Sequence, residues 1–143
     1  MDYRAVFQIA AAGMDLEKRR LDVAALNLAN LHASAAPGQQ PAAVQKVVAG
    51  PVQMAFAGAL RHQEAAQQLR EVQVIAAEGS SRLVHDPGHP HANAQGMVAY
   101  PAVDQATEMV TVSTALRAYE ANVAVASTAR AMAAKALELG GQS

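Results

Sequence analysis

The sequence predicts a mainly α-helical chain with a small β insertion. Two long terminal helices are expected to pair as a coiled coil, and the short segment between them in the sequence is expected to be rich in β-hairpins. Both ends lack proline and carry apolar residues at heptad spacing, whereas prolines, glycines and valines gather between them. The expected boundaries are an N-terminal helix within residues 1–33, an insertion over 34–101 and a C-terminal helix within 102–143.

The N-terminal helix is expected over residues 2–33, where Gly13 is the single glycine. One apolar line repeats every seven residues: Phe7, Met14, Leu21 and Leu28. A second line follows the same period: Ile9, Leu16 and Val23. At ~100° per residue these lines lie about 200° apart around the helix axis. A helix with apolar lines on two sides needs an apolar partner on each side.

The C-terminal helix is expected over residues 103–139 and is ended by Gly140 and Gly141. Its heptad seam consists of Met109, Val112, Leu116, Tyr119, Val123, Ala126, Ala133 and Leu137. Four more apolar residues lie off this seam: Val110, Val125, Met132 and Leu139. Two long helices with so much apolar surface predict an interaction surface for other molecules. A compact bundle in which the helices bend or break is the alternative.

The insertion begins with a loop over residues 34–43, which holds Pro37, Gly38 and Pro41. Strands are expected over residues 44–57, 70–78, 82–85 and 97–100, where valines and alternating apolar residues occur. Residues 59–68 fit either a short helix or a polar hairpin.

Composition narrows the possible functions. Among the 143 residues 52% are apolar but only 3% are aromatic, and much of the apolar share is alanine, which favours helices that meet closely along alanine-rich seams. The net charge of −1 and the absence of a basic run give no sign of nucleic-acid binding. The absence of cysteine excludes disulfides and thiolate zinc sites. We expect no membrane-spanning helix and no cleaved signal peptide.

The stretch HDPGHPH, residues 85–91, raises the question of a metal site. His85, Asp86, His89 and His91 offer the nitrogen and oxygen ligands that zinc accepts. The two prolines of the stretch make a rigid turn whose side chains need not converge. A proline-rich turn with exposed histidines is therefore favoured, and a metal-binding module is kept as an alternative.

Catalytic signals are weak. The sequence contains no nucleophile elbow, phosphate loop or dinucleotide fingerprint, so we expect no enzyme, no cofactor and no small-molecule substrate. Glu108 and Glu120 are interpreted as solvated or interfacial charges. Asn122 inside a helix is locally unfavourable, and is expected to be either exposed or fixed by a hydrogen bond across an interface.

Three segments together resemble the flagellar axial rod and hook protein family, in particular its proximal rod members. The first carries Gly13-Met14, Arg20-Leu21 and the Asn27-Leu28-Ala29-Asn30 pattern. The second, LVHDPGHPHANAQGMVAYPAV, is similar to that family's loop-and-strand signature, although His85 and His91 stand where the family tends to carry an aromatic residue and an aspartate. The third matches the family's terminal helix at Glu108-Met109, Ala115, Arg117 and the run from Tyr119 to Val123.

This resemblance implies a structural subunit of the flagellar basal-body rod, which transmits torque from motor to hook. It implies export through the flagellar apparatus without a cleaved signal peptide, assembly in the periplasm, and partners that are further copies and other rod proteins. A soluble helical adaptor or export chaperone is the remaining alternative.

Two sets of residues are predicted to matter for that role. The predicted assembly interface comprises Phe7, Met14, Leu21, Asn27, Leu28, Asn30, Met109, Leu116, Tyr119, Asn122 and Val123. The predicted junction turn comprises Asp86, Pro87, Gly88, His89 and Pro90, in which His89 is expected to hold the turn or to contact a neighbouring subunit.

Overall fold

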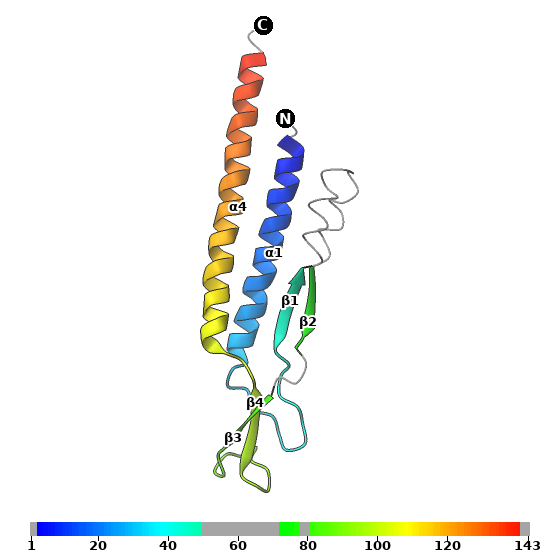
Figure 1. Ribbon diagram of the computed structural model, residues 1–143, viewed down its shortest axis with the longest axis vertical. Helices are drawn as coiled ribbons and strands as arrows, with labels where there is room; N and C mark the ends of the chain where they lie inside the picture. The colour runs from blue at the N-terminus through cyan, green and yellow to red at the C-terminus, as the bar shows by residue number, and fades with distance from the viewer. Residues whose placement is uncertain (1–2, 50–71, 78–80, 141–143) are drawn as a thin grey trace. The chain divides into compact units, whose positions relative to one another are not determined.

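The computed structural model of the chain describes residues 3–49, 72–77 and 81–140. Its elements follow the order α1 Tyr3–Ala29, β1 Gln45–Ala49, β2 Val72–Ala76, β3 Ser81–His85, β4 Met97–Pro101 and α4 Gln105–Gly140 (Figure 1). The expected mainly helical chain with a small β insertion is confirmed. The expected strand beyond Ala49 and the ambiguous segment 59–68 lie outside the described residues.

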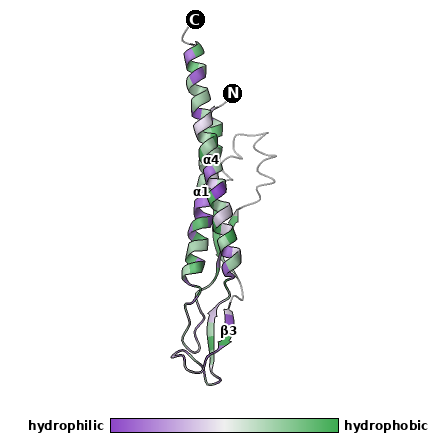
Figure 2. Ribbon diagram, turned by 90° about the vertical axis from the view of Figure 1, so that its left-hand side faces the viewer, coloured by the Kyte–Doolittle hydropathy of each residue, from purple (hydrophilic) through white to green (hydrophobic). Residues whose placement is uncertain are grey.

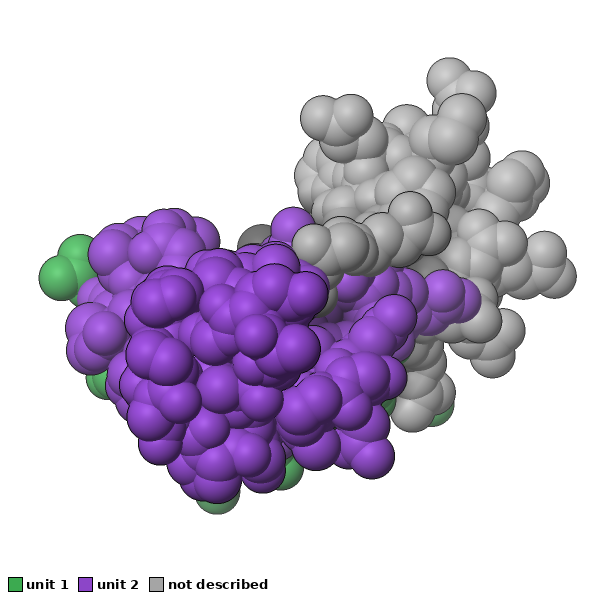
Figure 3. Space-filling view, turned by 90° about the horizontal axis from the view of Figure 1, so that it is seen from below, with its two compact units in different colours: residues 1–19, 49–72, 114–143 green, residues 20–48, 73–113 purple. Residues whose placement is uncertain are grey.

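Two compact units divide the chain. Unit 1 comprises residues 1–19, 49–72 and 114–143, and unit 2 comprises residues 20–48 and 73–113 (Figure 3). Each terminal helix contributes residues to both units. No helix in the described part of the chain is long and apolar enough to cross a membrane.

In unit 1, α1 and α4 pack antiparallel along small residues. Gly13 meets the side chain of Asn122, and Tyr3, ten residues earlier, lines the same groove as Met132, ten residues later. A Cβ atom added to Gly13 would lie 2.6 Å from Oδ1 of Asn122, so this contact depends on glycine. The buried alanines of this unit are Ala10, Ala115 and Ala129, which confirms the expected alanine-rich seam.

The buried line of α4 differs from the predicted heptad seam. Ala115 and Ala129 are buried, whereas Leu116 and Val123 are 47% and 43% exposed. Four other residues of the predicted seam, Val112, Tyr119, Ala126 and Ala133, are half-buried, so part of the seam lies on the packed face, whereas its positions at Leu116 and Val123 do not. The physical reason is the close approach at Gly13, because small side chains fit between closely spaced backbones and large side chains do not.

In unit 2, α1 ends at Ala29, before the predicted limit of residue 33. The Asn30 N–H still donates to the Leu26 carbonyl, but the Leu31 N–H donates to Leu28 instead, which tightens the last turn. Leu31 then packs with Val44 and Val103 in a small buried cluster. The helix therefore ends two residues before Leu31, whose side chain belongs to this cluster.

Two small sheets lie in the described part of the insertion. β1 pairs with β2, and β3 pairs antiparallel with β4, with Ser81 opposite Pro101 and His85 opposite Met97. A bridge from Ala35 to Ala99 attaches the loop after α1 to β4. The strands predicted at residues 82–85 and 97–100 are thus confirmed, and the buried Val98 and Pro101 make β4 the inner strand of its hairpin.

Asp104 caps the N-terminus of α4. Its Oδ1 accepts a hydrogen bond from the Ala106 N–H, and its Oδ2 accepts one from the Thr107 hydroxyl. A side-chain oxygen at this position satisfies a backbone donor that the first helical turn leaves free. The bonds from Thr107 and then from Ala106 hold the pKa of the Asp104 carboxyl below its ordinary value.

The contact at Gly13 predicts strong coupling between two substitutions. Gly13→Ala gains helix propensity of about 1 kcal/mol but forces the Asn122 side chain aside. In an Asn122→Ala background only the gain remains. A double-mutant cycle followed by urea unfolding should therefore show a coupling energy of about 1–2 kcal/mol. Additive effects of the two substitutions would contradict the close contact.

The cap predicts a pH dependence at the start of α4. A lowered carboxyl pKa in the folded chain contributes stability above the unfolded value, and this stability is lost as the pH falls below about 4. Asp104→Asn keeps a capping oxygen but cannot titrate. Circular dichroism between neutral and acidic pH should show a smaller helix loss for this variant than for the original chain. Equal losses would show that the cap charge has no role.

Candidate assembly interface

Large apolar side chains face solvent on both helices. Of the predicted interface residues, the exposed ones are Phe7, Met109, Leu116 and Val123, and the half-buried ones are Met14, Leu21, Leu28, Asn30, Tyr119 and Asn122. Hydrophobic residues recur along the length of both helices, interleaved with hydrophilic ones (Figure 2). Further exposed apolar residues on the helices are Ile9, Leu26, Val110, Val125, Met132, Leu137 and Leu139.

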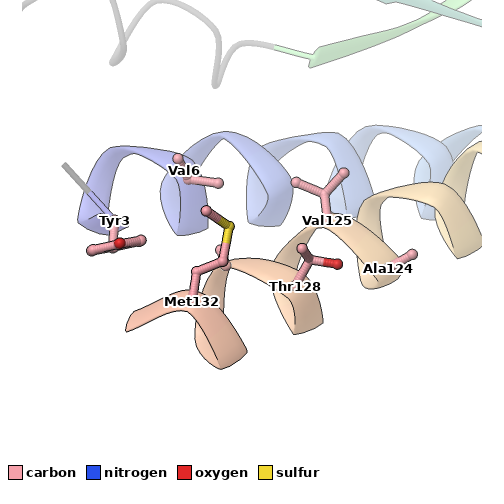
Figure 4. A pocket seen from close by; sticks show the side chains of 7 residues that line it. Tyr3, Val6, Ala124, Val125, Thr128 and Met132 are labelled. Carbon is pink, nitrogen blue, oxygen red and sulfur yellow. The ribbon is translucent and has the colours of Figure 1, made fainter. Parts of the chain in front are cut away.

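A groove of about 340 Å³ lies between α1 and α4 in unit 1 (Figure 4). Its lining consists of Tyr3 and Val6 from α1 and Ala124, Val125, Thr128, Ala129 and Met132 from α4. The lining is apolar except for the two hydroxyl-bearing side chains. Such a groove suits an apolar side chain of another helix better than a polar ligand.

Asn27 was predicted as an interface residue, and the structure gives it a role inside the chain. It is buried, and its Nδ2 donates to the Gln45 carbonyl at 2.8 Å and to Oε1 of Glu108 at 3.0 Å. Its Oδ1 accepts the Gln45 N–H at 2.9 Å. One amide thereby joins the end of α1 and the start of α4 to the first residue of β1.

Asn122 makes a local contact within the chain. It is half-buried, and its Nδ2 donates to the Ala118 carbonyl of the preceding turn of its own helix. This local bond turns the side chain back along α4, where it packs against Gly13. The residue shapes the contact between the helices within one chain.

The junction turn is closed by hydrogen bonds of the backbone and of His89. The Asp86 N–H donates to the Gly96 carbonyl, and the His89 N–H donates to the Asp86 carbonyl. Nδ1 of His89 accepts the His91 N–H at 3.0 Å, and the His89 ring lies edge-on to Tyr100. These contacts favour the first of the two expected roles of His89, which was to hold the turn.

The remaining turn residues, Pro87, Gly88 and Pro90, are exposed. His91 is engaged with Ser34, whose Oγ lies 2.9 Å from Nδ1 of the imidazole. Within the described ranges, no three His, Cys, Asp or Glu side chains are gathered closely enough to hold a metal ion. The histidines of this stretch therefore tie the hairpin loop to itself and to the loop after α1.

The sequence patterns do not predict two of the contacts described above, the Asn27–Glu108 hydrogen bond and the packing of Asn122 against Gly13. The Asn27–Glu108 hydrogen bond joins residues that are 81 positions apart in the sequence, and no local sequence pattern predicts it. The Gly13–Asn122 contact had a weak signal, since Gly13 is the single glycine of its helix and Asn122 is a polar residue in an apolar one. Each residue is unusual in its own helix, but no sequence pattern indicates that the two residues are in contact.

Comparison with known proteins identifies the family. Residues 94–139 match the family described as "Flagellar basal body rod FlgEFG protein C-terminal". The chain is 36% identical over 135 residues to the flagellar basal-body rod protein FlgC of Salmonella typhimurium, covering 94% of this chain and 96% of that protein. The chain belongs to the FlgC family of flagellar basal-body rod proteins.

More distant bacteria contain further relatives in this family. The protein named flagellar basal-body rod protein FlgC in Bacillus subtilis is 31% identical over 141 residues, covering 92% of this chain and 94% of its own. The protein of that name in Aquifex aeolicus is 31% identical over 123 residues and covers 86% of each chain. The similarity spans both helices and the insertion, and it confirms the family resemblance.

The Asn27 contacts predict that Asn27→Asp destabilises unit 2. Aspartate keeps the acceptor for Gln45 but places a carboxylate oxygen against Glu108, so two donated bonds become repulsive. We expect a loss of about 2–4 kcal/mol in the free energy of unfolding, measured by urea denaturation. Asn30→Asp is the matched control, because the Asn30 side chain makes no hydrogen bond within the described residues. Similar losses in both variants would contradict this role of Asn27.

Proposed function

We propose that this chain is a structural subunit of the bacterial flagellar rod and assembles through its terminal helices with further copies and with other rod proteins. Membership of the FlgC family supports the proposal. The single observation that carries it is the amount of apolar side chain that faces solvent on both helices of one chain. A subunit of a larger assembly removes this surface from water when it binds its neighbours.

The internal contacts support a structural role without catalysis. Polar side chains bridge distant parts of unit 2: Asn27 joins α1 to Gln45 of the insertion and to Glu108 of α4, and Ser34 joins His91 within the insertion. Their hydrogen bonds fix the geometry of the subunit. In this role the helices serve as the binding surface.

The location follows from the same family relationship. We infer that the chain works in the periplasmic rod after export through the flagellar apparatus, without cleavage of its N-terminus.

The proposal predicts that Leu116→Asp and Val123→Asp prevent incorporation into the rod. Both side chains are exposed in the single chain, so the subunit should remain folded, while an unpaired charge in an assembly contact costs about 3–5 kcal/mol. The measurement is the amount of the chain in purified basal bodies, together with motility. Ser113→Asp, another exposed position on α4, is the control and should incorporate. Normal incorporation of both aspartate variants would contradict the proposal.

A further inference from the structure

The loop that joins β3 to β4 contains two half-buried histidines, and each uses its Nδ1 atom in a hydrogen bond. Nδ1 of His89 accepts the main-chain N–H of His91 at 3.0 Å. Nδ1 of His91 lies 2.9 Å from the hydroxyl oxygen of Ser34, which belongs to the loop after α1. The first bond closes the turn on itself, and the second attaches the turn to another segment of unit 2.

The two imidazoles differ in how their hydrogen bonds respond to a proton. A main-chain N–H can only donate, so Nδ1 of His89 accepts this bond only while it carries no proton. A hydroxyl can donate or accept, so Ser34 can bond to Nδ1 of His91 in either protonation state. Protonation of the ring therefore removes the bond of His89 but leaves the bond between His91 and Ser34 possible.

A proton on His89 would also oppose the packing around its ring. The protonated Nδ1 would face the N–H of His91, so two donors would point at each other. The ring centroids of His89 and His91 are 5.4 Å apart, so two imidazolium ions at these positions would repel each other. The observed turn is thus the form that binds neutral His89.

Charges of both signs surround His89. Its titratable or charged neighbours among the described residues, on its own loop and on β3 and β4, are Asp86, His91, Tyr100 and Arg82, the last of which lies over the Tyr100 ring. His85, at the end of β3, faces Gly96. Sensitivity to pH is therefore assigned to the acceptor role of Nδ1 and not to the local field.

We propose that His89 is a pH-sensitive latch, which closes the junction turn when its imidazole is neutral and releases the turn when the imidazole takes up a proton. Histidine commonly changes its charge between about pH 5 and 8, so we expect the release within that range. The release is local, because the pairing of β3 with β4 and the bridge from Ala35 to Ala99 involve neither imidazole. The inference does not rest on the proposed function.

Nuclear magnetic resonance of the full chain labelled with nitrogen-15, followed from about pH 8 to 5, tests the latch. At neutral pH the His89 ring should carry its proton on Nε2, because Nδ1 is an acceptor. As the pH falls, the His91 amide signal should shift with the same midpoint as the His89 ring. Protection of this amide against exchange with solvent should fall about two- to tenfold, the ratio for one hydrogen bond between uncharged groups. Nuclear Overhauser contacts between Ser34 and His91 should persist.

His89→Asn separates the latch from other effects of acid, because asparagine Oδ1 takes the place of Nδ1 as an acceptor and does not titrate. The His91 amide should then keep its signal and its protection across the range, whereas His89→Ala should show the acid signal at every pH. His85→Asn is the matched control and should keep the original response, because His85 is exposed and its ring makes no hydrogen bond within the described residues.

Three results overturn the inference. The first is a proton on Nδ1 of His89 at neutral pH, and the second is an unchanged response of the His91 amide in His89→Asn. The third is loss of the contacts between Ser34 and His91 at the same midpoint, because acid would then open the whole loop. The first and third are read from the original chain, so they do not depend on the folding of any variant.

Discussion

The close contact between α1 and α4 at Gly13 is the constraint on which unit 1 depends. A side chain at this position would overlap Asn122, and Asn122 can occupy the space because its own amide is satisfied by the Ala118 carbonyl. With the backbones this near, the fully buried positions of α4 in this unit are the small residues Ala115 and Ala129. The large apolar side chains are consequently placed on the flanks of the helix pair.

This arrangement gives the single chain little apolar burial. Stabilisation scales with the apolar area removed from water, at about 25 cal/mol per Å², and alanine contributes little area. Val98 and Pro101, the largest fully buried side chains among the described residues, both belong to the β3–β4 hairpin of unit 2. The exposed leucines, valines and methionines of the helices would be removed from water by contact with other subunits. Assembly is therefore expected to add much of the stability of the helices.

The sequence predicted the elements better than the contacts between them. Absence of proline and heptad periodicity located both helices, and the prolines and glycine of the junction predicted its turn. Periodicity identifies apolar lines, but it cannot tell which line packs inside the chain. The predicted seam combines Leu116, which is exposed, with Val112, which is half-buried, whereas Ala115, which the seam omits, is buried. The bonds of Asn27 depend on tertiary folding, and no sequence window contains both partners.

The two units rely on different kinds of interaction, directional hydrogen bonds in unit 2 and apolar contact in unit 1. In unit 2, Asn27 holds three segments at fixed positions, and directional hydrogen bonds suit that task because they are lost with small displacements. In unit 1, the proposed contacts of the exposed apolar residues of α4 with other molecules need only non-directional apolar packing, which tolerates small shifts. In a subunit built in this way, the described contacts of unit 2 are made within one chain. Its helices keep exposed apolar side chains, which neighbouring subunits could cover.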